Sequence, residues 1–178
     1  MAKPIILCDC AGMSNDRWLA CREHGPKGDI PYTVGGSDVA AIFGLSPWTT
    51  PLELWLIKKG RMKAPVKSNE DQLEMGHLLE PIAAHWFEKK TGNLVTDDTN
   101  LYQHPDHSYA LANIDRRYTR QEDGEPGILE CKSCTYHKAE DWADDAIPLY
   151  YELQLRFYLA VLDVEYGAFS CIWGNNPE

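Results

Sequence analysis

The spacing of apolar residues changes along the chain, and this change constrains the fold more than any other feature. Up to about residue 92 the apolar side chains recur at helical spacing, whereas the following segments are short β-prone runs separated by turn residues. A helical pattern returns over 147–163, and YGAFSCIWG then reads as a last strand. The order predicts an α/β or α+β fold, with a helical N-terminal half and a central mixed sheet flanked by helices.

Local signals predict where the helices of the first half begin and end. Ser14 is a candidate N-cap for a helix that stops at Gly25, and Thr50 is a candidate N-cap with Pro51 at the first helical position. GGSDVAAIFG, between these two segments, is typical of a short helix opened by glycines.

The later segments carry one proline signal and one apolar stripe. Pro81 lies inside the helical pattern of 70–92 and predicts a kink or a new helix start immediately after Glu80. In 147–163, one helix stripe is formed by Leu149, Leu153, Phe157 and Val161. The β-prone runs NLVTD, NLYQHP, YALANIDRRY and GILECKS, with the turn QEDGEPG, predict an antiparallel meander.

Length and composition predict one domain spanning residues 1–178. A chain of 178 residues with 44% apolar content can bury one core but is short for two ordinary domains. It has no apolar run long enough to cross a bilayer, and its first residues lack the pattern of a signal peptide. We therefore expect a soluble protein, located in the cytoplasm, with no membrane partner.

The net charge of −10 argues against a protein that coats nucleic acid by bulk electrostatics. It leaves enzymes of nucleic acids open, because clustered carboxylates are what Mg²⁺ requires. Trp48, Trp55 and Trp86 are expected to face a core, without interleaved basic residues that would make a base-stacking platform.

The six cysteines are expected to be reduced thiols, mostly buried as small hydrophobic residues. The pairs in CDC (8–10) and CKSC (131–134) leave open a second interpretation, in which four thiolates bind a metal.

GILECKSC (127–134) places an acid and a base two positions apart in a strand. Residues i and i+2 share a face, so Glu130 and Lys132 point together while Leu129 and Cys131 point to the other side.

The intervening turn would bring Asp115 beside Glu130. Two carboxylates and a backbone carbonyl can hold Mg²⁺, and a nearby ammonium can orient or deprotonate a water, which is the equipment of phosphodiester hydrolysis. The alternative is an ordinary surface ion pair.

Four stretches, taken in order, give the chain a family resemblance. They are GGSDVAAIFGLSPWTTPLELW, MGHLLEPIAAHWFEKKTG, LANIDRRY through ILECKS, and YYELQLRFYLAVLD. Together they resemble the YqaJ-type viral recombinase family, relatives of phage lambda exonuclease in the PD-(D/E)XK nuclease superfamily. The resemblance implies a restriction-endonuclease-like core.

The same resemblance implies roles for particular residues. Asp115 and Glu130 match the metal-binding carboxylates, with the backbone carbonyl of Cys131 as a further ligand, and Lys132 matches the lysine of the D…ExK core. Glu80 matches an additional helix-borne carboxylate at the metal; its alternative is a solvated helix glutamate.

Two further pairs are assigned in the same way. Gln154 and Tyr158 match a Q-x-x-x-Y motif, in which Gln154 supports the lysine or the nucleic-acid backbone and Tyr158 supports the motif. Arg22 and Ser37 match the positions at which the family grips a DNA 5′-phosphate, and the alternative for Ser37 is a plain helix cap.

The expected function is therefore a Mg²⁺-dependent deoxyribonuclease, with Mn²⁺ able to substitute, acting 5′ to 3′ on linear double-stranded DNA in phage-type recombination. The resemblance implies a phage- or prophage-encoded protein that forms a homotrimer and works with a single-strand annealing protein. Two alternatives stay open: a structure-selective or restriction-like endonuclease with the same metal site, and a non-catalytic DNA-binding module that retains the nuclease fold.

Overall fold

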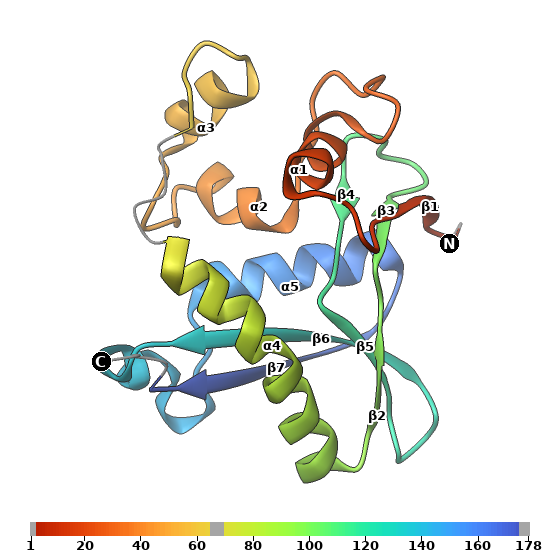
Figure 1. Ribbon diagram of the computed structural model, residues 1–178, viewed down its shortest axis with the longest axis vertical. Coiled ribbons are helices and arrows are strands. Elements are labelled where there is room, and N and C mark those ends of the chain that lie inside the picture. Colours follow the sequence, from red (N-terminus) through yellow and green to blue (C-terminus); the bar gives the residue numbers. More distant parts are fainter. Residues whose placement is uncertain (1–2, 65–69, 175–178) are drawn as a thin grey trace. The chain divides into compact units, whose positions relative to one another are not determined.

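The computed structural model describes residues 3–64 and 70–174, and its contacts divide the chain into two compact units (Figure 1). The first unit comprises Met1–Ala64, Thr99–Ile114 and Leu149–Val164, and the second comprises Pro65–Asp98, Asp115–Pro148 and Glu165–Glu178. The chain thus passes between the units several times. The single nuclease domain expected for residues 1–178 stays a prediction, because one such domain can contain two compact units.

The first unit contains four helices in the described part of the chain, and two of them begin directly after their predicted caps, Ser14 and Thr50. The four helices are α1 (Asn15–His24), α2 (Gly36–Ile42), α3 (Pro51–Lys58) and α5 (Leu149–Leu162). The Ser14 side chain caps α1 by accepting from the Arg17 N–H, and Gly25 ends the helix with a φ of 72°. Thr50 and Glu53 form a reciprocal capping box at α3.

A three-stranded antiparallel sheet completes the first unit. Its order is β1 (Ile5–Asp9), β3 (Asn100–Gln103), β4 (Leu111–Ala112). The sequence did not predict β1, and the prediction of one continuous meander was wrong, because β3 and β4 pair with β1 in a separate sheet. The buried Asp98, at the end of the second unit's segment Pro65–Asp98, accepts a hydrogen bond from Arg117 Nε at 2.6 Å.

The second unit is built on a mixed sheet. The strand order is β2 (Leu94–Asp97), β5 (Arg116–Thr119), β6 (Pro126–Cys134), β7 (Tyr166–Trp173). The first three strands are antiparallel neighbours, and β7 runs parallel to β6. A 3-10 helical segment, η1, spans Tyr136–Asp145. The predicted mixed sheet is confirmed.

The helix α4 (Glu70–Thr91) crosses β6 and β7 (Figure 1) and packs on them through small residues. Ala83 and Ala84 contact Leu129 and Cys131, which lets the helix approach the sheet closely. Pro81 lies inside this helix, so the new helix start predicted there is wrong. Packing of the following turn on β6 holds the segment helical although the proline removes one hydrogen bond.

The buried face of α5 differs from the predicted stripe. Leu155, Tyr158, Val161 and Leu162 are buried, whereas Leu149 is 50% exposed. The helix is apolar on most of its circumference, so spacing alone did not determine which face packs. None of the helices in the described part of the chain is long and apolar enough to cross a membrane.

Candidate active site

Strands β5 and β6 bring Asp115 beside Glu130. Arg116 is the register partner of Leu129, so the residue before Arg116 lies next to the residue after Leu129. Asp115 Oδ2 accepts the backbone N–H of Cys131 at 2.8 Å, which ties the carboxylate to the middle of β6. The predicted neighbourhood of these two acids is therefore present.

Glu130 and Lys132 share one face of β6, as their spacing predicts. Lys132 Nζ donates to Glu130 Oε1 at 2.7 Å. Leu129 and Cys131 point to the opposite face, into the core beneath α4. Glu130 is only 1% exposed, so the alternative of an ordinary surface ion pair is wrong. A buried carboxylate is costly unless it is paired and hydrogen-bonded, and Lys132 offsets part of this cost for Glu130.

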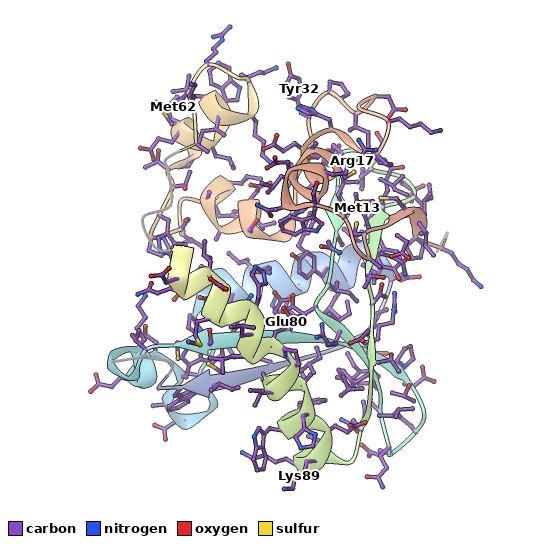
Figure 2. All side chains as sticks on the ribbon, in the orientation of Figure 1. Met13, Arg17, Tyr32, Met62, Glu80 and Lys89 are labelled. Atoms are coloured by element: carbon purple, nitrogen blue, oxygen red, sulfur yellow. The ribbon has the colours of Figure 1, made fainter. Side chains whose placement is uncertain are left out.

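Glu80 reaches the same region from the middle of α4 (Figure 2). Its Oε1 accepts from Arg116 Nη1, and its side chain is 23% exposed. Arg116 also donates from Nη1 to the Asp115 carbonyl at 2.6 Å and pairs through Nε with Asp97 at 2.9 Å. The alternative of a solvated helix glutamate does not describe this contact. Sequence analysis missed Arg116, although its place directly after Asp115 was a usable signal.

Burial and neighbouring carboxylates raise the pKa of Glu130 and of Glu80. Burial, and then the neighbouring Asp115, raise the pKa of Glu130 to about 7, against the lowering effect of Lys132 and with a smaller contribution from Glu80. Burial and Asp115 also raise the pKa of Glu80, in spite of the Arg116 guanidinium. Three acids therefore lie close enough to repel, and a cation would relieve that repulsion.

The donor atoms fit a hard divalent cation by their chemistry. Carboxylate oxygens and a backbone carbonyl are the ligands that Mg²⁺ takes from proteins. The Cys131 thiol faces the core and burial raises its pKa to about 12, so only its backbone is a candidate donor. Among the described residues, no three His, Cys, Asp or Glu side chains form a ready-made metal cage. Glu80 and Glu130 instead hold Arg116 and Lys132.

Comparisons with known proteins identify the family. The model of the YqaJ-like viral recombinase domain matches residues 17–165. The chain belongs to this family. It is 37% identical over 174 residues to the uncharacterized protein YqaJ of Bacillus subtilis strain 168, a match that covers 96% of this chain and 50% of that protein. The chain thus spans about half the length of that relative.

Solved structures share the fold. LHK-Exo, an alkaline exonuclease from Laribacter hongkongensis, superposes with a TM-score of 0.66 at 18% identity, covering 92% of this chain and 76% of that one. LHK-Exo in complex with dAMP gives a TM-score of 0.68 at the same identity and coverage. The restriction-endonuclease-like fold predicted from the sequence is confirmed.

The remaining predicted site residues lie in the first unit. Gly35 lies close to the guanidinium of Arg22, since a Cβ built on Gly35 would be 3.6 Å from Arg22 Nη2. Ser37 follows in the first turn of α2. Arg22 is therefore close to the backbone that carries Ser37.

Gln154 and Tyr158 lie on one face of α5, as their spacing predicts. Gln154 Nε2 donates to the Tyr158 hydroxyl at 3.2 Å. A Cβ on Gly36 would fall 2.5 Å from Tyr158 Cε1 and 2.9 Å from Gln154 Cγ, so only glycine fits there. The pair thus packs against the start of α2 in the first unit, and a role for Gln154 beside Lys132 stays a prediction.

All six cysteines are free thiols. Cys8 and Cys10 are 4.0 Å apart at their sulfur atoms, while Cys134 lies 3.5 Å from Cys171 of β7. Cys131 and Cys134, three positions apart on one strand, point to opposite faces and do not act as a thiolate pair. The alternative of a four-thiolate metal site is not supported.

Proposed function

We propose that the chain is a Mg²⁺-dependent deoxyribonuclease that acts as a 5′ to 3′ exonuclease on linear double-stranded DNA. The observation that carries the proposal is the buried Glu130, bonded to Lys132 and placed among Asp115 and Glu80. Membership of the viral recombinase family supports a nuclease that acts on DNA. The fold shared with an alkaline exonuclease adds to that support.

Asp115, Glu130, Glu80 and the carbonyl of Cys131 are the residues that would hold Mg²⁺ or Mn²⁺. When bound, the cation would supply Lewis-acid stabilisation of the charge that develops on the phosphate. The chain itself contributes a fixed donor set, because Asp115 is tied to the Cys131 amide and Glu80 to Arg116. Burial of Glu130 also keeps bulk water from its carboxylate.

Lys132 positions the attacking water in this proposal. Its Nζ is held by Glu130, and its side chain is 18% exposed, so it keeps access to the surface of the site. An ammonium held in this way can donate a hydrogen bond to a water or, after losing its proton, accept one from it. Glu130 thus has two tasks, as a cation ligand and as the anchor of Lys132.

Arg22 and Ser37 would bind the terminal 5′-phosphate, since a guanidinium grips a phosphate in a bidentate manner. Gln154 would support the lysine or the DNA backbone, with Tyr158 holding its amide. The trimer and the annealing-protein partner remain predictions from the family resemblance.

The proposal is tested by incubating the protein with linear duplexes that carry 5′-phosphate or 5′-hydroxyl ends, beside a closed circle, with and without Mg²⁺. We expect Mg²⁺-dependent loss of nucleotides from the phosphorylated linear duplex. Glu130→Ala should abolish this activity, while Glu74→Gln, an exposed site on the same helix as Glu80, should retain it.

Each alternative predicts a different result. Equal cutting of the circle, with no effect of Arg22→Ala or Ser37→Ala on end preference, would favour an endonuclease. Absence of cleavage with Mg²⁺ or Mn²⁺, together with DNA binding unchanged by Glu130→Ala, would favour a non-catalytic module.

A further inference from the structure

The segment that ends α3 is strongly basic in an acidic protein. Residues 57–63 read IKKGRMK, with four cations and no acid, whereas the whole chain has a net charge of −10. Lys59, Arg61 and Lys63 are exposed. The local charge is therefore opposite in sign to that of the molecule.

Two of these cations lie over exposed aromatic rings. Lys59 Nζ is 3.8 Å from the ring centroid of Tyr32, and Arg61 Cζ is 5.2 Å from that of Trp55. Each ring is 46% exposed. The sequence prediction that three tryptophans face a core without basic neighbours is wrong. Trp48, Trp55 and Trp86 are 62%, 46% and 44% exposed, and cations lie over Trp55 and Trp86. In α3 no residue is buried, so the ring of Trp55 faces solvent. We name Tyr32, Trp55, Lys59 and Arg61 the basic-aromatic surface; Tyr32 is labelled in Figure 2.

Neighbouring acids do not cancel this charge. Asp38 is paired with Lys58 at 2.7 Å, and Glu53 is bonded to Thr50 at the other end of α3. Within the described ranges, neither Lys59 nor Arg61 lies within ion-pair distance of a carboxylate. The cations are thus available to an anionic ligand.

We propose that the basic-aromatic surface binds a single strand of DNA. Lys59 and Arg61 would contact successive phosphates, and unpaired bases would stack on Tyr32 and Trp55, each of which has a second face beyond the one its cation covers. A duplex keeps its bases stacked inside and would use the cations alone. An acidic polypeptide would likewise have no use for the rings. The inference rests on the proposed function, since degradation of one strand of a duplex leaves the other strand single.

The test measures binding of a fluorescein-labelled oligothymidylate by anisotropy, in EDTA so that no hydrolysis occurs. Lys59→Ala/Arg61→Ala should weaken binding about tenfold and reduce the slope of log K against log salt by about 1.4, since each phosphate contact on a single strand contributes about 0.7. Tyr32→Leu/Trp55→Leu should weaken binding by a similar factor with the slope unchanged, because stacking releases no counterions.

Lys3→Ala/Lys90→Ala is the matched control, because it removes the same charge from exposed positions outside the basic-aromatic surface. Lys89 is left unchanged, because its Nζ lies 4.5 Å from the ring centroid of Trp86. The control should change the affinity less than twofold. An equal loss in this control would mean bulk electrostatics and overturn the proposal. Competition by polyglutamate as strong as that by DNA, with no effect of the leucine variant, would reassign the surface to an acidic polypeptide.

Thermal melts check that each variant is folded before its binding is compared. Cleavage of a linear duplex by the unchanged protein with Mg²⁺ is measured separately. If cleavage is absent but the binding results hold, the proposed nuclease function is rejected and the strand-binding surface is supported. If cleavage is present but the binding results fail, only the strand-binding surface is rejected.

Discussion

Replacing Glu130 by glutamine should make the metal-free protein more stable at alkaline pH. Glu130 is 1% exposed, and its pKa is raised from an ordinary 4.5 to about 7 by burial and by Asp115. Because the pKa of Glu130 is higher in the folded than in the unfolded protein, protonation of this group stabilises the fold. The stabilisation is complete below the unfolded pKa and is lost as the pH rises through the folded pKa. The native protein should therefore lose stability between about pH 4.5 and about pH 8.

The size of this loss follows from the two pKa values. At 1.36 kcal/mol for each unit of pKa difference, a rise from 4.5 to about 7 corresponds to about 3 kcal/mol. Glu130→Gln carries no titrating group and escapes this loss. Urea unfolding in EDTA should show the variant gaining about 3 kcal/mol on the native protein between about pH 4.5 and about pH 8.5.

Added Mg²⁺ should reverse the order at alkaline pH, because a ligand that binds only the folded state stabilises it and the variant lacks one donor. Glu53→Gln serves as a control of opposite sign: bonds from the Thr50 N–H and hydroxyl lower the pKa of Glu53, so the native residue stabilises at neutral pH and this contribution is lost on acidification. A stability difference between Glu130→Gln and the native protein that does not change with pH would refute the reasoning.

Two other substitutions test the packing and the electrostatics of the site. Gly36→Ala places a Cβ 2.5 Å from Tyr158 Cε1 and should cost about 1–3 kcal/mol in urea unfolding, whereas Gly76→Ala, with its nearest neighbour at 3.6 Å inside α4, should gain about 0.5–1 kcal/mol. A gain at Gly36 would show that the two helices do not meet there as described. Arg116→Met removes the cation that holds Glu80, so it should lower the melting temperature in EDTA. Added Mg²⁺ should raise the melting temperature of this variant by more than it raises that of the native protein. An equal Mg²⁺ effect on both proteins would contradict that role.

Features with a local cause were predictable from the sequence. Ser14 and Thr50 cap their helices through bonds to residues three positions away, so the short-range pattern contains the whole interaction. The shared face of Glu130 and Lys132 likewise follows from the two-residue period of a strand.

Features decided by distant contacts were not predictable. The β-prone pattern of residues 100–112 does not say which strand it pairs with, and β1 supplies that partner from the start of the chain. Arg116 belongs to the site because it donates to Glu80, which lies 36 positions earlier in the chain. The exposure of Trp55 depends on which face of α3 packs against the rest of the unit. Apolar residues lie on several sides of this short helix, so tertiary contacts and not the sequence pattern determine that face.

The net charge of the chain does not by itself decide whether the protein binds DNA, because charge acts locally. At physiological ionic strength the Debye length is about 8 Å, so a phosphate at the basic-aromatic surface senses Lys59 and Arg61 far more than the sum of −10. The acids are not a general repulsive coat either. Glu130 is paired with Lys132 and Glu80 with Arg116, and a divalent ion would neutralise the charge that remains. An acidic protein can thus act on DNA if its DNA-facing cations are exposed and the acids of its site are neutralised by cations.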